Sequence, residues 1–524
     1  MKVLSPERMT KYDSYAITEW GIPSPVLMEN AGRSVFRLMK EKYVHKMDSI
    51  VIVAGKGNNG GDGFVVARYA KLEGSDVTVY LLGEKKSLKG DAHLNMVLYE
   101  KIGGRVIELT KELGPLKEGI SKATIVVDAI FGTGLSKEIS GIEREAIEII
   151  NTAKKMVVAI DIPSGLNGKT GRPSPVCVAA DHTFTFAYPK LGHLLYPGAQ
   201  YTGKLTVIDI SIPPLAEDIL GWDAQLIDGN MLRRLLKNRA PDSHKGTYGH
   251  CAVIAGSKGK TGAAYMASLS ALKIGAGLVT LVIPESLNPI LEMKTTEVMT
   301  YPVLDNGKGY FIMDALEITK EFLLDKDVII LGPGLSQEKE TLEFARRIFL
   351  ETDKPFVIDA DGINAFKEDP SLLKHGRGRT IITPHPGEFS RLIRKTTKEI
   401  NENRLEFGMT FVKEYGVVLV LKGARTLIFD SNGEVYINPT GNPSLAKGGS
   451  GDILTGFIGG LSSQGYTLTE SAILGTYLHG YMADRWIEKF SEMDLLATDL
   501  LLDLGLAIRE IKDGKDRVYI EKSI

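Results

Sequence analysis

The chain has 524 residues, of which 43% are hydrophobic and 24% charged, and its formal net charge is −2. This length exceeds one ordinary hydrophobic core, so we expect two large domains of soluble globular composition. A near-neutral charge argues against a protein that binds nucleic acid through phosphate contacts. Two cysteines without a CxxC spacing argue against a zinc site or a disulfide framework.

The sequence also lacks signals for secretion or membrane insertion. The first residues, MKVLSPERMTKYD, have no apolar core of the kind found in a signal peptide. No apolar run is long enough to cross a bilayer. We therefore expect a cytoplasmic enzyme without a membrane partner.

The first half of the chain alternates strand-like and helix-like segments. Residues 5–45 are predicted to be helical, and residues 49–54 (SIVIVA) form a β-branched run typical of a buried parallel strand. Further strands are predicted at 76–82, 123–130 and 156–162. Such alternation predicts a doubly wound parallel sheet, in which ligands bind at the carboxyl ends of the strands.

Polar, glycine-rich loops follow three of these strands. The first is GKGNNGGDG at 55–63, the second is FGTGLSKE at 131–138 after Asp128, and the third is PSG after Asp161. The first loop fits neither a clean GxGxxG fingerprint nor a P-loop, because it lacks the Lys-Ser/Thr pair. Each acid alone could cap a helix or form a turn, but three polar clusters at one sheet edge predict a shared binding site.

The motifs NNGGDG, DAIFGTGL and DIPSGLNG, in this order and spacing, resemble the N-terminal domain of the NAD(P)HX epimerases, the YjeF family. The resemblance covers residues 1–212 and implies a Rossmann-like three-layer sandwich that epimerises a hydrated nicotinamide nucleotide. It also implies a potassium ion held by Asn59, Asp128 and Ser164, which are hard oxygen donors.

The same resemblance implies Asp161 as the acid–base residue. A carbon that carries a hydroxyl beside nitrogen inverts once a proton is moved, and a positioned carboxylate is enough for that. The implied substrate contacts are Asn58, Asn59, Gly60, Gly61, Asp62, Gly132, Thr133, Gly134, Leu135, Ser136, Lys137, Glu138 and Asp161. His182 and His193 are single histidines, and we expect no catalytic role for either.

A boundary is predicted between the two halves. The segment IPPLAEDILGWDA, residues 212–224, has two prolines, several acids and no clear periodicity. It predicts a linker at 213–224 and a second domain at 225–524.

The second half repeats the pattern of strand and glycine loop. Strands are predicted at 249–255, 327–331, 355–359 and 417–421. The first of them runs into GSKGKTG, which imitates a Walker A motif, but Ile254 stands where that motif requires glycine. We interpret this loop as a turn that packs a helix on the sheet, with substrate contact near Ala264.

Two later loops carry polar side chains suited to ligands. His385 lies between two prolines in TIITPHPGEFSRL, with Glu388 close by. His385 could be a general acid, a substrate contact or a turn residue, and the flanking prolines favour a contact. The strand at 417–421 ends at KGART, residues 422–426, where Lys, Gly and Thr suit a nucleotide phosphate or base.

The stretch NPSLAKGGSGDILTG, residues 442–456, is the most informative of the chain. Its glycines run into Asp452 and an apolar helix, and the start of a helix suits an anion. A carboxylate beside a phosphate can take the proton of a hydroxyl that attacks it. We therefore predict a phosphoryl-transfer site with Gly449–Gly451 as the anion hole and Asp452 as the base. A plain helix cap is the alternative, since Asp is a favoured cap.

The motifs GPGL, TPHPGEF, LKGA and NPSLAKGGSGD resemble the ribokinase-like fold, and more closely the ADP/ATP-dependent NAD(P)HX dehydratases. The resemblance covers residues 225–520 and implies Asp452 as the base. The implied contacts to the hydrated nucleotide are Ala264, Gly334, His385, Pro386, Gly387, Glu388, Phe389, Ser390, Arg391 and Asp452. The implied contacts to the adenine nucleotide are Lys422, Gly423, Ala424, Arg425, Thr426, Asn442, Pro443, Ser444, Leu445, Ala446, Lys447, Gly448, Gly449, Ser450 and Gly451.

Together the two resemblances imply an α/β protein with two doubly wound domains and two activities. One domain interconverts the R and S epimers of NADHX and NADPHX, and the other dehydrates the S epimer with ADP (or ATP) as co-substrate. Magnesium is expected because phosphoryl transfer requires charge neutralisation. We also expect a homo-oligomer.

Two other functions remain open at this point. The second half could be a small-molecule kinase of the hydroxymethylpyrimidine or hydroxyethylthiazole type with a regulatory N-domain. The first half could be a non-catalytic scaffold, although Asp161 beside an intact NNGGDG loop argues against that function.

Overall fold

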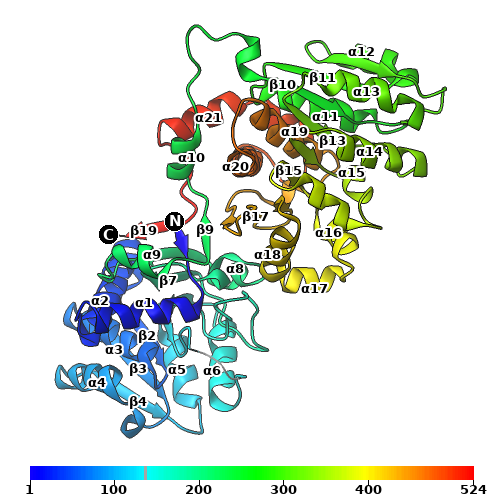
Figure 1. The fold of residues 1–524 in the computed structure, drawn as a ribbon. Coiled ribbons are helices and arrows are strands. Elements are labelled where there is room, and N and C mark those ends of the chain that lie inside the picture. The colour runs from blue at the N-terminus through cyan, green and yellow to red at the C-terminus, as the bar shows by residue number, and fades with distance from the viewer. Residues whose placement is uncertain (135–137, 524) are drawn as a thin grey trace. The chain divides into compact units, whose positions relative to one another are not determined.

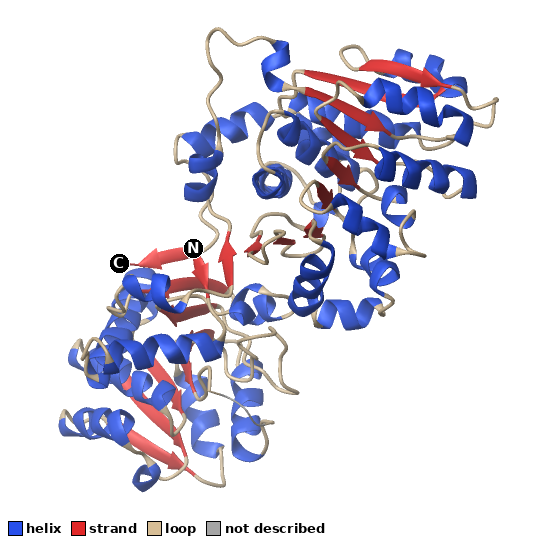
Figure 2. Ribbon diagram, in the orientation of Figure 1, coloured by secondary structure: helices blue, strands red, loops and turns tan. Residues whose placement is uncertain are grey.

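The computed structural model describes residues 1–134 and 138–523 (Figure 1). The chain packs into two compact units. The N-terminal unit contains Lys2–Gln225 together with residues 520–523, and the C-terminal unit contains Met1 and Leu226–Tyr519. Each is a parallel α/β unit, which confirms the predicted fold class (Figure 2).

The N-terminal unit is built on an eight-stranded sheet of described residues, in the order β19-β8-β7-β6-β5-β2-β3-β4. All neighbouring strands are parallel. The strands are β2 (Ser49–Ala54), β3 (Asp76–Leu82), β4 (Arg105–Leu109), β5 (Ile125–Ala129), β6 (Met156–Ile160), β7 (His182–Phe186), β8 (Lys204–Ile208) and β19 (Glu521–Ser523).

Helices cover both faces of this sheet, because alternate residues of its strands face opposite layers. In β2, Ile50 and Ile52 enter one core cluster, whereas Val51 and Val53 enter the other. The helices are α1 (Pro6–Thr18), α2 (Ser24–Tyr43), α3 (Asn58–Leu72), α4 (Gly90–Lys101), α5 (Gly114–Lys122), α6 (Gly141–Thr152), α7 (Leu191–Leu194), α8 (Gly198–Thr202) and α9 (Leu215–Leu220). The unit is therefore a helix–sheet–helix sandwich.

The C-terminal unit has its own sheet, in the order β18-β17-β16-β15-β14-β13-β10-β11-β12. The strands from β16 to β12 are parallel, and β17 and β18 add an antiparallel hairpin beside β16. The strands are β10 (His250–Ile254), β11 (Leu278–Pro284), β12 (Met299–Val303), β13 (Val328–Leu331), β14 (Phe356–Ile358), β15 (Thr380–Ile382), β16 (Val418–Leu421), β17 (Leu427–Phe429) and β18 (Val435–Ile437).

Helices again flank the sheet of the C-terminal unit. α19 packs closely against α11 and α20, because small residues let the backbones approach. Gly456 shows the closeness, since a Cβ there would lie 2.3 Å from the Ala267 carbonyl oxygen. The helices are α10 (Gly229–Leu235), α11 (Thr261–Lys273), α12 (Asn288–Lys294), α13 (Leu316–Leu323), α14 (Lys339–Glu351), α15 (Asp361–Asn364), α16 (Pro386–Ile393), α17 (Thr397–Glu402), α18 (Arg404–Tyr415), α19 (Ser450–Ser463), α20 (Leu468–Ile487) and α21 (Leu504–Lys512).

The segment predicted as a linker, residues 213–224, is structured. It contains α9 and packs on α1, where the Tyr12 hydroxyl donates to the Gly221 carbonyl over 2.8 Å. The linker prediction is wrong because a helix of six residues is too short to show periodicity between two prolines and a glycine.

The predicted end of the second domain is also wrong. Residues 520–523 belong to the N-terminal unit, where β19 pairs with β8 in parallel. Glu521 accepts a hydrogen bond from the Thr206 hydroxyl (3.0 Å) and forms an ion pair with Lys42 (2.6 Å). Nothing local in a three-residue strand indicates which of two sheets it will join.

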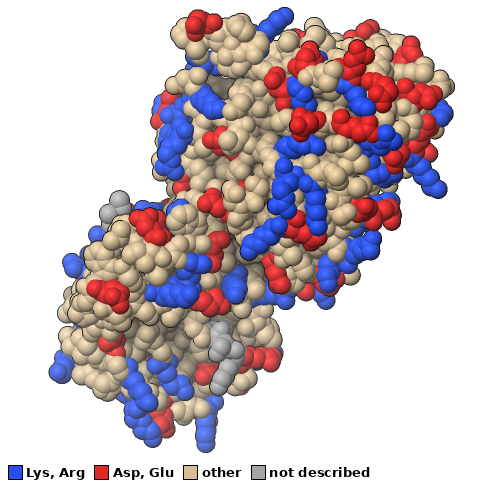
Figure 3. Space-filling model, viewed as in Figure 1, with Lys and Arg blue, Asp and Glu red and all other residues tan. Residues whose placement is uncertain are grey.

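The described part of the chain has no helix that is both long and apolar enough to span a membrane. On the face drawn in Figure 3, basic and acidic side chains lie interspersed.

Candidate active sites

The N-terminal unit gathers polar side chains at the carboxyl ends of β5 and β6. The Ser164 hydroxyl and backbone amide donate to the two oxygens of Asp128 over 2.6 and 2.8 Å. The Asn59 side-chain amide donates to the Phe131 carbonyl over 3.0 Å. Burial raises the pKa of Asp128 to about 6, although the hydrogen bonds from Ser164 oppose the shift. The three residues expected to hold potassium therefore lie around one backbone turn.

One atom of this cluster lacks a partner. The side-chain oxygen of Asn59 is buried, and no group in the described part of the chain donates to it. A buried acceptor without a donor is costly, so it suits a cation. The oxygen atoms around it belong to a carboxylate, a hydroxyl and a backbone carbonyl, and all three are hard metal ligands. Within the described ranges no three His, Cys, Asp or Glu residues are grouped as for a transition metal. The residues fit an alkali ion.

Asp161 follows β6 and is held by Lys190, a residue that the sequence analysis missed. Asp161 has a φ of 63°, a strained left-handed conformation for a residue other than glycine. The Lys190 ammonium donates to Asp161 over 2.7 Å, to the Thr185 hydroxyl over 2.9 Å and to the Phe186 carbonyl over 3.1 Å. Burial would raise the pKa of Asp161, but the charge and hydrogen bond of Lys190 hold it below its ordinary value. Asp161 is therefore a carboxylate.

Further titratable groups surround this ion pair. His193 accepts from the Lys190 backbone amide over 3.0 Å, and burial lowers its pKa to about 3, so it is neutral. Burial, followed by the charges of neighbouring acids, raises the pKa of Asp62 well above its ordinary value. Burial raises the pKa of Asp13 in α1 to about 6. Asp13 and Lys190 stand in segments without a recognisable motif, which is why the sequence did not reveal them.

The glycines of the first loop serve packing as well as access. A Cβ on Gly60 would lie 2.1 Å from the Gly55 carbonyl oxygen, so the loop itself requires glycine there. A Cβ on Gly61 would meet the flexible end of Met28, and a Cβ on Gly134 would have no atom of the described residues within 4 Å. Asn58 and Glu138 are exposed, and Gly132 and Thr133 half-buried. Leu135, Ser136 and Lys137 lie outside the described residues.

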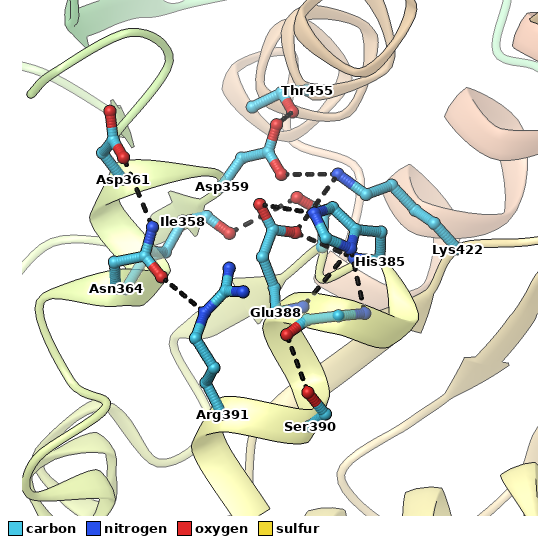
Figure 4. Close-up of polar contacts among 12 residues, drawn as sticks. Ile358, Asp359, Asp361, Asn364, His385, Glu388, Ser390, Arg391, Lys422 and Thr455 are labelled. Atoms are coloured by element: carbon cyan, nitrogen blue, oxygen red, sulfur yellow. Dashed lines mark hydrogen bonds and ion pairs between the residues drawn. The ribbon is translucent and has the colours of Figure 1, made fainter. Parts of the chain in front are cut away.

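In the C-terminal unit, Asp359 is the centre of the second site (Figure 4). It follows β14, is buried, and accepts from the Lys422 ammonium over 2.8 Å and from the Thr455 hydroxyl over 2.7 Å. Lys422 also lies 3.9 Å from Glu388. Lys422, which we expected at the nucleotide, thus lies beside Asp359 and Glu388. The sequence did not reveal that these two acids share one site with Lys422.

Asp452 lies in the first turn of α19, beside this cluster. Burial, together with the nearby charge of Asp359, raises the pKa of Asp452 to about 7, although Lys422 opposes the shift. Gly449 precedes the helix with a φ of 95°, and among residues 1–134 and 138–523 no atom lies within 4 Å of a Cβ placed on Gly448. A Cβ on Gly451 would lie 3.5 Å from the Lys422 ammonium. The arrangement is a helix N-terminus with open space, a cation and a carboxyl group that titrates near neutrality.

His385 caps α16. Its Nδ1 accepts from the backbone amides of Gly387 (3.0 Å) and Glu388 (3.3 Å), so that nitrogen carries no proton. The hydrogen bonding is reciprocal, because the Glu388 carboxylate accepts from the His385 backbone amide over 2.9 Å. Burial lowers the pKa of His385 and raises that of Glu388. The Nε2 atom of His385 lies 3.4 Å from the Glu388 carboxylate, and 51% of the His385 side chain is exposed. His385 is a cap that is also accessible to a ligand.

A line of polar contacts extends from α16 to the loop before α11. The Arg391 guanidinium donates to the side-chain oxygen of Asn364 over 3.2 Å, and the side-chain amide of Asn364 donates to Asp361 over 3.3 Å (Figure 4). Asp361 also accepts from the Lys260 ammonium over 2.9 Å. Gly334, with a φ of 61°, is packed so tightly that a Cβ would lie 2.9 Å from the Lys260 carbonyl oxygen.

Not every predicted contact faces this site with its side chain. Phe389 is fully buried against Phe411, at 5.2 Å between ring centroids, so its side chain is part of the core. Ala264 belongs to α11 and is buried in the core cluster of the C-terminal unit. Pro386 and Ser390 are half-buried, and the Ser390 hydroxyl donates to the Gly387 carbonyl over 2.9 Å.

The loop at 422–426 is held in place by Arg404 of α18, which the sequence analysis missed. The Arg404 guanidinium donates to the carbonyls of Leu421 (2.8 Å) and Ala424 (2.9 Å). Burial lowers the pKa of Arg404 to about 10. Arg425 donates to the Pro439 carbonyl, and the Thr426 hydroxyl to the Gly423 carbonyl over 3.1 Å. These hydrogen bonds fix the course of the loop backbone.

The stretch before Asp452 is anchored from α20. The Asn442 side chain donates to Asp484 over 2.9 Å and caps the short helix Pro443–Leu445. The His479 ring nitrogen Nε2 lies 2.9 Å from the Ser450 carbonyl, and burial lowers the pKa of His479 to about 4. A neutral His479 therefore donates to this carbonyl and fixes the turn. Ala446 and Lys447 are exposed, and the Lys447 ammonium donates to the Met493 carbonyl over 2.5 Å.

Comparisons with known proteins match both units. A family model described as YjeF-related protein N-terminus matches residues 24–192, and one described as NAD(P)H-hydrate dehydratase matches residues 251–504. A bifunctional NAD(P)H-hydrate repair enzyme Nnr from Moorella thermoacetica is 41% identical over 99% of this chain and 98% of its own. Its namesake from Escherichia coli is 34% identical over 91% of this chain and 88% of its own.

Solved structures also resemble the chain. The ADP/ATP-dependent NAD(P)H-hydrate dehydratase from Bacillus subtilis, co-crystallized with ATP/Mg2+, is 30% identical and covers 56% of this chain and 99% of its own, with a TM-score of 0.47. A ribokinase-like superfamily protein from Enterococcus faecalis is 23% identical and covers 55% of this chain and 96% of its own, with a TM-score of 0.49.

Proposed function

The chain belongs to the family of bifunctional NAD(P)H-hydrate repair enzymes, and on this premise we propose how its two units divide the work. The N-terminal unit epimerises R- and S-NAD(P)HX at the site around Asp161. The C-terminal unit dehydrates S-NAD(P)HX to NAD(P)H at the site around Asp452, with ADP converted to AMP and phosphate. The two reactions suit one chain, because the dehydratase uses one epimer and the epimerase supplies it.

The position of Asp452 carries the proposal for the second reaction. In the first step, Asp452 takes the proton of the ring hydroxyl, whose oxygen attacks the terminal phosphorus of the nucleotide. AMP leaves, and its phosphate is held by the amides of the glycine turn before α19. Lys422 lies where it can neutralise the charge that develops during transfer.

In the second step the carbon–oxygen bond breaks. Hydroxide is a poor leaving group, whereas the phosphorylated hydroxyl leaves as phosphate. The lone pair of the ring nitrogen replaces the lost electron pair, and loss of a proton from the neighbouring carbon restores the reduced ring. One water is thus removed from the substrate and appears in the phosphate released from ADP.

The proposed metal ions have different support. Asn59, Asp128 and Ser164 would hold potassium, supported by the partnerless Asn59 oxygen, and the ion would fix the loop that carries Asp62. Magnesium would neutralise the phosphates during transfer. Because no three His, Cys, Asp or Glu side chains of the described residues are grouped so that they could hold a metal ion, we propose that magnesium is held mainly by the nucleotide and water.

We also propose a homo-oligomer. The support comes from exposed large apolar side chains, among them Met493 (85% exposed) and Leu502 (72%) in the C-terminal unit.

The decisive test follows absorbance in the reduced-nicotinamide band. Purified protein is incubated with NADHX of mixed epimers, magnesium, potassium and ADP. We expect a rise that consumes both epimers. A rise that stops at the S fraction, after correction for spontaneous epimerisation, would remove the epimerase from the proposal. A stable phosphorylated product without reduced nicotinamide, with ADP or ATP, would replace the dehydratase by a small-molecule kinase.

The two sites can be separated by one substitution. Asp161→Ala removes the carboxylate held by Lys190, so we expect epimerisation to be abolished and dehydration of the S epimer to be unchanged. Separate assays on pure R and S epimers measure both rates. Epimerisation that survives in this variant would show that Asp161 is not the acid–base residue.

A further inference from the structure

Asp62 is a buried carboxyl group that the structure leaves without a partner. It lies in the second turn of α3 with 8% of its surface exposed. Across residues 1–134 and 138–523, its side chain makes no hydrogen bond or ion pair within the protein. Burying an ionisable group without a partner is costly, so such a group is retained where a ligand supplies the partner or where it carries a proton.

The charged groups that face Asp62 come from four other segments. They are Asp161 after β6, Asp13 in α1, Asp91 in α4 and Lys190 before α7. The only cation of this set, the Lys190 ammonium, is bonded to Asp161 at 2.7 Å. Asp91 accepts from the Ser24 hydroxyl over 2.6 Å. The two carboxyl groups therefore have different environments, because Asp161 is bonded to the Lys190 cation, whereas Asp62 has three acids nearby and no cation bonded to it.

We propose that Asp62 is the proton donor of the epimerisation and works with Asp161 as the proton acceptor. This inference rests on the proposed epimerase activity and adds a second catalytic residue to it. It also separates Asp62 from the rest of the NNGGDG loop, whose other residues position the substrate.

The two groups complete a balanced reaction. The carboxylate of Asp161 takes the proton of the ring hydroxyl while the bond between the hydroxyl-bearing carbon and the ring nitrogen breaks. The carboxylic acid of Asp62 gives its proton to that nitrogen, so the ring opens to an aldehyde and an amine. The aldehyde turns its other face to the nitrogen. Ring closure returns a proton to Asp62 and one from Asp161 to the oxygen, with the carbon inverted.

The electrostatics of the site suit these roles. Burial, then the charges of Asp161, Asp13 and Asp91, raise the pKa of Asp62 well above its ordinary value, and Lys190 opposes the shift only in part. The two pKa values are therefore moved apart, so in the pH range between them Asp62 carries a proton and Asp161 does not. A pair of carboxyl groups whose environments move their pKa values apart is the arrangement that assigns one as acid and the other as base.

The test measures conversion of pure R epimer to S by chromatography, without ADP so that the dehydratase is silent. Rates are measured with potassium between pH 5 and 9, with the spontaneous rate subtracted at each pH. For the wild-type chain we expect the rate to fall as pH rises through the pKa of Asp62. For Asp62→Asn we expect kcat to fall by about 10²–10⁴, the alkaline fall to disappear, and KM to change little.

Asp13→Asn is the matched control, because it makes the same chemical change beside the same site. It removes one charge that raises the pKa of Asp62, so the alkaline fall should remain and move to lower pH. Dehydration of the S epimer and the circular dichroism spectrum report folding. If Asp62→Asn is unfolded, Asp62→Ser is measured by the same criteria.

An alkaline fall that persists in Asp62→Asn, or a loss of kcat below tenfold, would overturn the role of Asp62. Failure of the wild-type chain to epimerise at all is a different result, because it overturns the proposed epimerase activity itself.

Discussion

Asp452 combines two properties that can be tested separately. As a base it must be ionised, and its pKa is raised to about 7, so the rate of dehydration should rise with pH through about 7. Asp452→Asn should lower kcat by about 10²–10⁴ and remove this rise. Dehydration of pure S-NADHX with ADP, measured between pH 5 and 9, checks both. A variant that keeps the rise would show that another group takes the proton.

The same substitution should not destabilise the protein. Because the pKa of Asp452 is raised in the folded state, the folded chain binds the proton more tightly than the unfolded chain. Stability therefore falls as pH rises from the unfolded pKa to about 7, and Asn removes that loss. Urea unfolding at pH 8 should give a free energy of unfolding equal to or above that of the wild type. A lower value would indicate that the Asp452 carboxylate mainly stabilises the first turn of α19, whose cap residue is Gly449.

At the scale of single residues, the sequence indicates which acids belong to the sites but not which residues form ion pairs with them. Asp161 and Asp452 attract attention in the sequence because Asp161 ends a predicted strand and Asp452 follows glycine at the start of a predicted helix. Lys190 is 29 residues from Asp161, and Lys422 is 63 residues from Asp359. Ion pairs of that separation depend on which strand ends the sheet brings together, and no local pattern records it.

The turn before α19 makes a prediction about an element. Gly449 has a φ of 95°, and a Cβ there would lie 2.6 Å from the Met266 methyl, so Gly449→Val both strains the turn and displaces the helix start. We expect ADP binding to be lost. Gly448→Ala is the matched control, because that position has open space and an ordinary φ, and ADP binding should weaken less.

Isothermal titration of both variants with ADP and magnesium makes the comparison. Equal binding by Gly449→Val and the wild type would contradict the anion hole. The experiment uses circular dichroism to confirm that each variant is folded.

Elements differed in how well the sequence predicted them. β2 is a continuous buried run, and its prediction at residues 49–54 is confirmed to the residue. The helical prediction for residues 5–45 was too coarse, because α1 ends at Thr18 and α2 begins at Ser24. α9 and β19 were missed, since six and three residues are too few for a period to appear. The sequence of a long, strongly patterned element is enough to predict it, whereas the formation of a short element depends on what it packs against.

At the scale of the whole molecule, the pairing of β19 with β8 leads us to expect that residues 520–523 stabilise the N-terminal unit. Deleting residues 520–524 removes the ladder to β8 and the contacts of Glu521 with Lys42 and Thr206. At about 1 kcal/mol for each lost hydrogen bond, we expect the N-terminal unit to lose roughly 1–3 kcal/mol. Epimerase activity should be lost at a lower temperature, and dehydratase activity should keep its temperature profile.

Residual activities after heating measure the effect on each unit. Lys522→Ala is the control, because Lys522 is exposed and the strand can still pair. If the deletion lowers the heat resistance of the dehydratase instead, the assignment of β19 to the first unit is wrong in solution.

The position of β19 also sets an order of events on the ribosome. Residues 2–225 emerge first, but β8 remains an edge strand until about 300 further residues have been made. At about 5–20 residues per second this delay lasts roughly 15–60 s. During that time β8 offers unpaired backbone groups to any neighbouring nascent chain or chaperone. The sheet of the N-terminal unit can therefore be completed only after the residues of the C-terminal unit have been made.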